Sequence, residues 1–332
     1  MTAYLILTIV LILSMAVYIR WAKRNGIIDI PNERSSHKKP TVMGGGIIFL
    51  VAVLCWGLLF DHSAWLLIIS ILLIGLIGFL DDRYSLHQLP RLFFQSFSVL
   101  MIQYFIGAFE LPYILIGIGF ILITGWLNTF NFMDGINGIS VLYAASVMLG
   151  VFLFKESVST APVSLMYSIG ISLAVFGFVN VRKHATAFAG DVGSLSLGLI
   201  LALFILDLIL TTGRWEFIVF LSVYGIDSVM TIIYRIKRRE NIFEAHRSHL
   251  YQYLANELKV PHVAVSLIYS TLQFLVILGF TFIPVKITWI YAIGILILLV
   301  GMYITAKYLI ILKLGNGSES FPESSYGINC NN

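Results

Sequence analysis

Residues 113–154, YILIGIGFILITGWLNTFNFMDGINGISVLYAASVMLGVFLF, decide the fold class of this chain. Asp134 is the only charged residue in the stretch, and an apolar run flanks it on each side. A helix needs about 20 apolar residues to cross a bilayer, and each run reaches that length. Across all 332 residues, 59% are hydrophobic and 11% are charged. Soluble domains are about 25% charged, so the composition excludes an ordinary soluble enzyme, a disordered chain and a disulfide scaffold.

The sequence predicts an all-α, polytopic membrane helix bundle with about 10–11 transmembrane helices. The candidate spans are 2–20, 43–60, 64–80, 91–109, 113–131, 135–154, 161–180, 194–212, 215–234, 262–283 and 288–312. The first span does not resemble a cleaved signal peptide, because no basic residue precedes it and no small-residue cleavage site follows it. We expect one integral-membrane domain over residues 1–314 and a polar tail over 315–332.

The basic residues predict the orientation. When the loops are numbered alternately, all but three of the 21 Lys and Arg residues fall in one set, the exceptions being Lys155, Arg214 and Lys286. Lys and Arg accumulate in cytoplasmic loops. We therefore expect an external N-terminus, a cytoplasmic C-terminus and a functional site on the cytoplasmic face of the membrane. The net charge of +4 does not indicate a nucleic-acid partner, because the basic residues fall in the loops of a membrane protein.

Acidic residues mark three places at the predicted cytoplasmic edge, which are Asp81-Asp82, Asp134 and Asp191. Asp81 and Asp82 end an apolar run, where intramembrane acids are candidates for function. Paired carboxylates suit Mg²⁺, although a solvated helix end offset by Arg83 is the alternative. Asp191 lies between glycines at a predicted helix start, so it is either an N-cap or a metal ligand.

The segment 128–138 joins two spans with almost no loop to spare. Asn131 and Asp134 are three residues apart, so one helical turn can present both on the same face. Polar, irregular backbone at membrane depth is tolerated where it lines a cavity or is buried in protein. This makes a plain turn the weaker interpretation of the segment, and a cavity the stronger one.

Two further loops carry glycine or histidine. The glycines at 44–46 let backbone N–H groups approach an anion, or else form a hinge beside a positive anchor. A helix in the loop 235–260 would place His246 and His249 on one face, where Arg side chains can clamp a diphosphate. A basic helix on the membrane surface is the alternative. Two further acids, Asp207 and Asp227, lie inside predicted spans. We interpret Asp207 as structural, and the role of Asp227 is ambiguous.

Acids, cations and glycines at one lipid interface suggest Mg²⁺-dependent phosphoryl transfer between a soluble donor and a lipid. The motifs, in this order, resemble those of the bacterial polyprenyl-phosphate N-acetylhexosamine-1-phosphate transferases, glycosyltransferase family 4. The matching segments are Arg34-Ser35-x-His37 with Pro40-Thr41 and 44–46, Asp81-Asp82, Asn128-x-x-Asn131-x-x-Asp134-Gly135-x-Asn137-Gly138, Phe188-x-Gly190-Asp191-x-Gly193-Ser194 and His246-Arg247-x-His249.

The resemblance implies a reaction in which a UDP-N-acetylhexosamine gives its sugar-1-phosphate to undecaprenyl phosphate and UMP is released. It also implies a location in the bacterial inner membrane with a periplasmic N-terminus, and it implies roles for individual residues. The implied metal ligands, for Mg²⁺ or Mn²⁺, are Asp191, Asp81 and Asp82. The catalytic candidates are Asp81, Asp82, Asp134, His246 and His249. The substrate-binding candidates are Arg34, His37, Asn128, Asn131, Asn137, Phe188 and Arg247. Asn131 and Asp134 match positions that hold the uridine end, and Phe188 matches an aromatic that stacks on uracil.

Departures from the family pattern bear on the branch. Asn137 stands where the family often has Asp, and His246-Arg247-Ser248-His249 replaces a run of consecutive histidines. No proline precedes the Phe188 motif. These differences favour enzymes that begin surface polysaccharides such as O-antigen over the enzyme that makes lipid I. The sequence leaves open whether the protein forms a homodimer. The alternative function is a membrane transporter of polyprenyl phosphate or a nucleotide sugar, although the acids cluster at one edge and not at the midplane.

Overall fold

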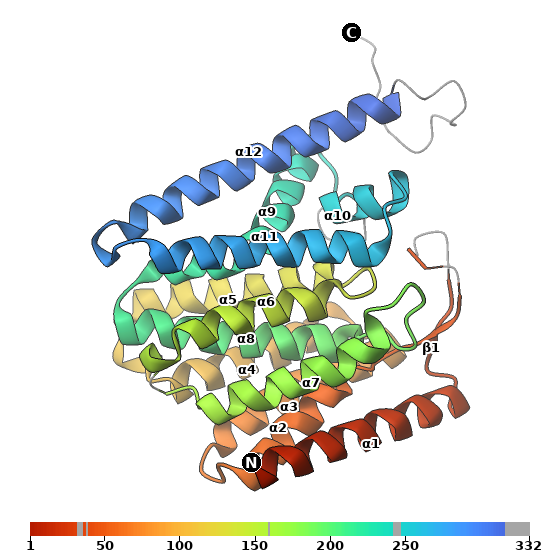
Figure 1. Ribbon diagram of the computed structural model, residues 1–332, viewed down its shortest axis with the longest axis vertical. Coiled ribbons are helices and arrows are strands. Elements are labelled where there is room, and N and C mark those ends of the chain that lie inside the picture. Colours follow the sequence, from red (N-terminus) through yellow and green to blue (C-terminus); the bar gives the residue numbers. More distant parts are fainter. Residues whose placement is uncertain (32–35, 38, 159, 242–246, 316–332) are drawn as a thin grey trace.

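A computed structural model describes residues 1–31, 36–37, 39–158, 160–241 and 247–315. The chain is built from helices and one two-stranded ribbon (Figure 1). The helices are α1 (Thr2–Arg24), α2 (Ile47–Leu59), α3 (Trp65–Tyr84), α4 (Gln88–Phe105), α5 (Tyr113–Met133), α6 (Ile139–Leu153), α7 (Val163–Asn180), α8 (Gly190–Thr212), α9 (Ser222–Lys237), α10 (Leu250–Gln252), α11 (His262–Phe282) and α12 (Thr288–Gly315). The short helical turns are η1 (Ala108–Glu110), η2 (Lys155–Ser157), η3 (Trp215–Leu221), η4 (Tyr253–Glu257) and η5 (Val285–Ile287). The strands β1 (Ile28–Asp29) and β2 (Thr41–Val42) pair antiparallel.

The all-α membrane fold predicted from the sequence is confirmed. Among the described residues, eight helices are long and apolar enough to cross a membrane, and α2 and α6 are shorter apolar helices. All eleven candidate spans fall on helices, with α4 as the fourth and with η3 and α9 together as the ninth. Helices suit this setting because lipid offers no hydrogen bonds, so each segment must satisfy its own backbone.

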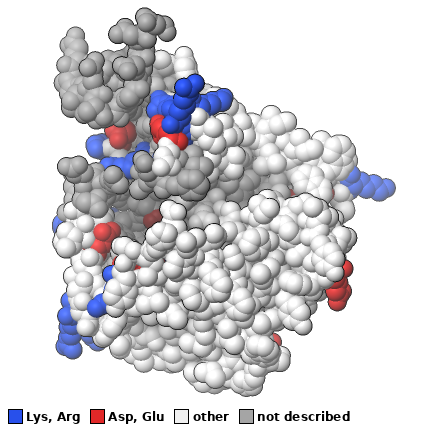
Figure 2. All heavy atoms as spheres, turned by 180° about the vertical axis from the view of Figure 1, so that it is seen from behind, with Lys and Arg blue, Asp and Glu red and all other residues white. Residues whose placement is uncertain are grey.

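Helix α8 forms the centre of the bundle. It packs against α2, α3, α5 and α6, and most of its side chains are buried (Figure 1). The outer helices α1, α5 and α12 instead expose large apolar side chains, such as Leu5, Ile121 and Ile297. Figure 2 shows a broad face without charge, while most charged side chains gather along one edge and at the top. The uncharged face is suited to contact with lipid tails.

The ribbon lies at the end of the bundle where the α7–α8 loop also lies (Figure 1). Val42 of β2 forms a parallel bridge with Ala187, and the Phe188 N–H donates to the carbonyl of Val42 over 2.8 Å. Segments that are about 145 residues apart in sequence are thereby joined at the start of α8. This junction positions the loop that contains Phe188 and Asp191.

The glycines that precede α2 pack against this loop. The Gly45 N–H donates to the Phe188 carbonyl over 2.7 Å, and the Gly46 N–H donates to the Ala189 carbonyl over 2.9 Å. A Cβ on Gly46 would collide with the Cα of Gly193, so only glycine permits this approach of α2 to α8. Of the two interpretations of these glycines, the anion site is wrong for the amides of Gly45 and Gly46, because protein carbonyls already accept their hydrogen bonds.

Candidate functional site

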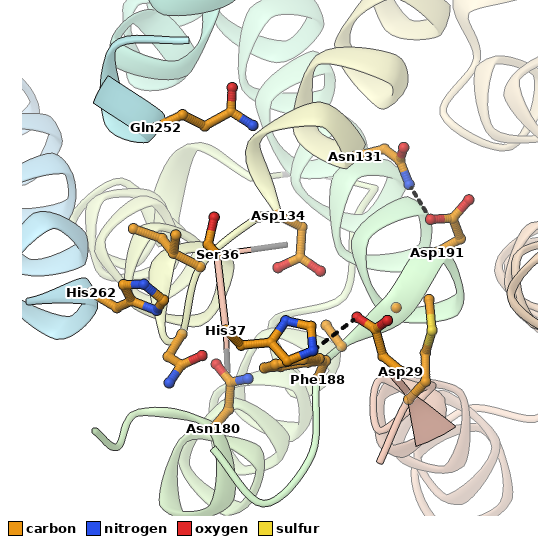
Figure 3. A pocket seen from close by; sticks show the side chains of 16 residues that line it. Asp29, Ser36, His37, Asn131, Asp134, Asn180, Phe188, Asp191, Gln252 and His262 are labelled. Carbon is orange, nitrogen blue, oxygen red and sulfur yellow. Dashed lines mark hydrogen bonds and ion pairs between the residues drawn. The ribbon is translucent and has the colours of Figure 1, made fainter. Parts of the chain in front are cut away.

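A cavity of about 200 Å³ lies where the α5–α6 turn, the α7–α8 loop and the segment after β1 converge (Figure 3). Its lining includes six of the residues predicted from the sequence. They are His37, Asn131, Asp134, Asn137, Phe188 and Asp191. These residues come from three distant segments, so the fold brings together most of the motifs that define the predicted site.

Asn131 connects the end of α5 to the start of α8. Its Nδ2 donates to Asp191 Oδ1 over 2.8 Å and to Ser194 Oγ over 3.0 Å (Figure 3). Helix α5 ends at Met133, so Asp134 lies just beyond the helix while Asn131 lies in its last turn. Both side chains still line the same cavity, although Asp134 lies outside the helical turn that their spacing predicted.

Asp134 is a half-buried carboxyl group with one close donor. Ser140 Oγ donates to Asp134 Oδ1 over 2.6 Å. Burial raises the pKa of Asp134 to about 7, and the Ser140 hydrogen bond opposes that rise because it favours the charged form. Its ionisation therefore falls in the physiological pH range, where a carboxyl group can exchange a proton or accept a hydrogen bond from a ligand.

Asp81 lies in a second cavity of about 330 Å³, beside Asp82 and Asp191. Asp81 Oδ1 accepts the Leu86 N–H over 2.7 Å, and Arg91 Nη1 lies 2.8 Å from Asp81 Oδ2. Arg91 Nη2 is also 3.6 Å from Asp191 Oδ2. One guanidinium thus lies between two predicted metal ligands, and no sequence motif assigns this role to Arg91. Its signal in the sequence is its position at the start of an apolar run.

Asp82 faces the start of α8. Its Oδ1 accepts the Asp191 N–H over 2.9 Å, and its Oδ2 lies 3.4 Å from the Val192 nitrogen. The residue before the helix, Ala189, has no side-chain acceptor, so Asp82 supplies the cap from α3. Asp191 itself lies in the first turn of α8 and is not its N-cap. The metal-ligand interpretation of Asp191 is therefore compatible with the structure, and its N-cap alternative is wrong.

The carboxylates of Asp81 and Asp191 converge, as their shared contact with Arg91 demonstrates. Among the described residues, no group of three or more His, Cys, Asp or Glu side chains is placed to hold a metal ion. Mg²⁺ is usually bound by one or two protein carboxylates together with water and substrate phosphates. This donor pair therefore fits a magnesium ion that takes its other ligands from phosphate, and does not fit an all-protein metal cage.

A third cavity, of about 970 Å³, adjoins the first and shares His37, Phe188 and Asn137 with it. The ring of Phe188 makes an edge contact with His37, with 4.8 Å between ring centroids. The charged residues that line the large cavity are Lys39, Lys183, Arg247, Lys259 and Glu257. Four cations against one carboxylate favour an anionic ligand there.

Other predicted residues lie elsewhere. Asn128 donates to the Thr124 carbonyl of its own helix and does not line the three cavities described above. His249 is buried at 3% exposure and caps the start of α10. Residues 247–249 are not helical, so the expected helix does not extend over His249. Arg34 and His246 lie outside the described residues.

The cavities also contain residues that the motifs did not reveal. Asp29 carries a carboxylate oxygen 3.7 Å from His37 Nε2, and Gln252 and His262 line the small cavity. Asn137 does line this cavity, but its Nδ2 donates to the carbonyl of Arg182 over 2.9 Å. It therefore also holds the α7–α8 loop in place.

Comparisons with known proteins point to one family of transferases. Residues 64–209 match the family model Glycosyl transferase family 4. A phospho-N-acetylmuramoyl-pentapeptide-transferase of Thermodesulfovibrio yellowstonii is 33% identical over 235 residues, which cover 54% of this chain and 64% of that protein. A probable undecaprenyl-phosphate N-acetylglucosaminyl 1-phosphate transferase of Bacillus subtilis is 24% identical over 275 residues, 76% of each chain.

The chain thus spans less than two thirds of the length of the first of these relatives. The family match covers α3 to α7 and most of α8, and this region contains five residues that line the cavities, namely Asp81, Asp82, Asn131, Asp134 and Asp191. The chain is a polytopic membrane protein, and its residues 64–209 are similar to Glycosyl transferase family 4.

Proposed function

We propose that the chain transfers N-acetylhexosamine-1-phosphate from a UDP-N-acetylhexosamine to undecaprenyl phosphate, giving an undecaprenyl-diphosphate sugar and UMP. The observation that carries the proposal is the position of Asp191. It lines both the small cavity and the cavity that contains Asp81 and Asp82. A soluble donor and a lipid phosphate that enter from these two sides would meet at Asp191.

The proposed step is a displacement at phosphorus. An oxygen of the lipid phosphate forms a bond to the sugar-bearing phosphorus of the donor, and the bond from that phosphorus to the bridging oxygen breaks. UMP leaves with the bridging oxygen. Asp81, beside Arg91, is the candidate that removes a proton from the lipid phosphate, and the guanidinium offsets the negative charges that approach one another there.

We propose that Asp81 and Asp191 hold Mg²⁺ together with the donor phosphates, while Asp82 acts mainly by holding the start of α8. When bound, the ion neutralises phosphate charge and stabilises the leaving UMP. Asn131 then has two tasks, because it fixes Asp191 Oδ1 and also faces the small cavity. Its amide is suited to hold the Asp191 carboxylate in one orientation.

The donor side is proposed to be the large cavity and its junction with the small one. Lys39, Lys183 and Arg247 would attract a nucleoside diphosphate, and Phe188 offers an aromatic face at the junction. Base–aromatic stacking contributes about 1–3 kcal/mol per base. These residues lie on the side that the loop charges predict to be cytoplasmic, which is where a UDP-sugar would arrive.

For the donor we favour UDP-GlcNAc or a deoxy relative, with the product entering a surface polysaccharide. This proposal rests on the departures at Asn137 and in the loop that contains His249. The two relatives described above carry names from both branches, so the identity of the sugar is what the first experiment must decide.

The test is UMP release by the purified full-length protein in detergent with undecaprenyl phosphate, Mg²⁺ and a panel of UDP-N-acetylhexosamines, with and without EDTA. We expect metal-dependent UMP release with one donor. The test variant is Asp191→Asn, and its matched control is Asp207→Asn. Both replace a carboxylate in α8, but Asp207 lies outside the cavities. Only the first should abolish turnover.

A folded protein that releases no UMP from any donor, with or without Mg²⁺, would contradict the transferase. In that case, uptake of labelled UDP-sugar or movement of undecaprenyl phosphate in proteoliposomes would test the transporter. The transporter is the weaker candidate, because the carboxylates here gather at one end of the helices and not at their middle.

A further inference from the structure

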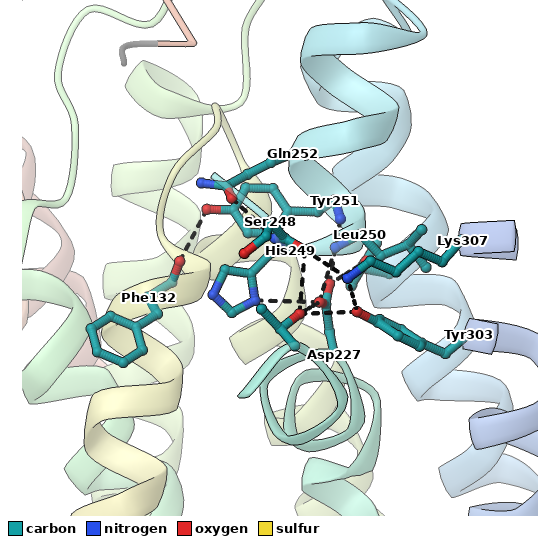
Figure 4. A network of polar contacts seen from close by, with 11 residues as sticks. Phe132, Asp227, Ser248, His249, Leu250, Tyr251, Gln252, Tyr303 and Lys307 are labelled. Atoms are coloured by element: carbon teal, nitrogen blue, oxygen red, sulfur yellow. Dashed lines mark hydrogen bonds and ion pairs between the residues drawn. The ribbon is translucent and has the colours of Figure 1, made fainter. Parts of the chain in front are cut away.

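Asp227 in α9 is a buried carboxylate at the centre of a polar network (Figure 4). Its side chain is 2% exposed. The groups that face its oxygens are His249 Nδ1 at 3.3 Å, the Leu250 N–H at 3.0 Å, the Tyr251 N–H at 3.4 Å, the Tyr269 hydroxyl at 2.6 Å and the Thr231 hydroxyl at 3.3 Å. A buried carboxylate is costly unless donors surround it, and here donors come from three helices and a loop.

This network continues to the candidate site through α10. Leu250 and Tyr251 open this short helix, and Asp227 accepts both of their N–H groups. The Tyr251 hydroxyl then donates to the Phe132 carbonyl over 3.0 Å. Phe132 lies directly after Asn131 and two residues before Asp134, so Tyr251 holds the turn that presents both to the small cavity.

The packing around Tyr251 is tight enough to transmit a displacement. A Cβ on Gly135 would collide with the Tyr251 hydroxyl, so the phenol fills the space beside the α5–α6 turn. The next residue, Gln252, lines the small cavity itself. A shift of α10 would therefore move both the hydroxyl that holds Phe132 and a side chain in the cavity wall.

Helix α12 holds the same loop from the other side. Lys307 Nζ donates to the Ser248 carbonyl over 3.0 Å and to the Tyr303 hydroxyl over 2.8 Å (Figure 4). Tyr303 in turn shares a hydrogen bond of 3.0 Å with Thr231. The loop is thus held from α9 and from α12, and both helices lie outside the matched family region at 64–209.

We propose that Asp227 is a positioning residue for the donor side of the site, acting through α10 and Tyr251 on the turn of Asn131 and Asp134. The inference rests on the proposed transferase function. A purely structural carboxylate is the competing explanation, and Asp207 provides the comparison. Asp207 is 1% exposed, lies in α8 and accepts the N–H groups of Thr160 and Ala161, away from the cavities.

The experiment compares Asp227→Asn, Tyr251→Phe, the double variant and Asp207→Asn in the full-length protein. We expect Asp227→Asn to lower kcat/KM for the UDP-sugar by about 10- to 100-fold, because misplacing binding groups by about 1 Å costs on the order of 100-fold. Tyr251→Phe should give a smaller loss, and the double variant should lose less than the product of the two single losses. The KM for undecaprenyl phosphate should stay unchanged.

Hydrogen–deuterium exchange of the segment 131–138 supplies a readout that needs no turnover. Asp227→Asn and Tyr251→Phe should speed exchange there, and Asp207→Asn should not. The inference is overturned if Asp227→Asn only lowers the Tm, as Asp207→Asn does, with exchange at 131–138 and kcat/KM unchanged. If the wild-type protein releases no UMP, the proposed function fails, and the exchange measurement alone decides the positioning role.

Discussion

The backbone N–H of Asp191 donates a hydrogen bond to the carboxylate of Asp82, with 2.9 Å between the nitrogen and Oδ1. The first N–H groups of a helix have no partner within the helix and need an outside acceptor. Asp82 provides it from α3, and Gly190 makes the approach possible, because a Cβ there would collide with the Asp82 carboxylate. The motif with Asp82 and the motif with Asp191 therefore form one hydrogen-bonded unit.

This relationship predicts different outcomes for two substitutions at Asp82. Asp82→Ala removes the cap, and losing a cap costs about 0.5–2 kcal/mol of stability. Asp82→Asn keeps one acceptor oxygen for the Asp191 N–H and should lower the Tm less. Thermal unfolding of both variants in the same detergent measures the difference. Equal losses of Tm would show that the charge, and not the acceptor, holds the start of α8.

Arg91 predicts how the site responds to Mg²⁺. Its guanidinium lies against Asp81 and Asp191, so it competes with a bound cation for the same oxygens. Arg91→Gln should lower the Tm without metal and shift the Mg²⁺ concentration for half-maximal stabilisation about tenfold lower, since a neighbouring charge at this distance is worth about one pKa unit or more.

The control for Arg91 is Arg83→Gln. Arg83 is adjacent to the acidic pair in sequence, but its side chain is directed to Tyr84, with 3.2 Å between Nε and the hydroxyl. Arg83→Gln should leave the Mg²⁺ concentration for half-maximal stabilisation near the wild-type value. If the two arginine variants respond to Mg²⁺ alike, Arg91 does not compete for the metal ligands.

The helices and the acids were predictable because each has a strong local signal. Runs of about 20 apolar residues specify spans, and Asp134 and Asp191 are conspicuous because carboxylates are rare at membrane depth. The polar segment 128–138 at membrane depth also favoured a cavity over a plain turn, and Asn131 and Asp134 line one. These features depend on residues that are close together in the sequence, so one sequence is enough to predict them.

The remaining features depend on distances between helices. Arg91 reads as a loop cation in the sequence, and only the packing of α4 on α3 brings it to Asp81. The amides of Gly45 and Gly46 look available for a ligand until the α7–α8 loop occupies them. Asp227 was ambiguous because its partners at 249–251 follow a loop whose path the sequence does not specify.

The raised pKa of Asp134 predicts a pH dependence of stability. In the unfolded chain an aspartate titrates near 4, and in the fold this one titrates at about 7 because it is buried. Between these values the folded state holds a proton that the unfolded state has lost. Stability is therefore highest below pH 4 for this group and falls as pH rises towards 7.

Asp134→Asn should remove this contribution. The Tm of the ligand-free wild type should fall more between pH 5 and pH 8 than the Tm of the variant, measured in one detergent without Mg²⁺. Comparing the two curves cancels the other titrating groups. Parallel curves would mean that Asp134 does not titrate in this range.

The contact between Gly46 and Gly193 predicts a strong packing effect. Gly46→Ala places a methyl group against the backbone of α8, which cannot move aside as a side chain would. Overpacking of this kind costs about 1–3 kcal/mol, so the Tm should fall clearly. Gly225→Ala in α9 is the control, since no atom lies within 4 Å of its added Cβ. Equal Tm values for the two variants would contradict the close packing of α2 on α8.

Phe188 predicts a selective effect on the donor. It lines the two cavities assigned to the donor but not the one with Asp81, where the lipid phosphate is proposed to bind. Phe188→Leu keeps apolar volume but removes the stacking face, so the KM for the UDP-sugar should rise about tenfold, within the range of base stacking. The KM for undecaprenyl phosphate should not change. Phe178→Leu, at a 73% exposed position on α7, should alter neither. A parallel rise in both KM values for Phe188→Leu would indicate a general disturbance of the site and remove Phe188 from the donor pocket.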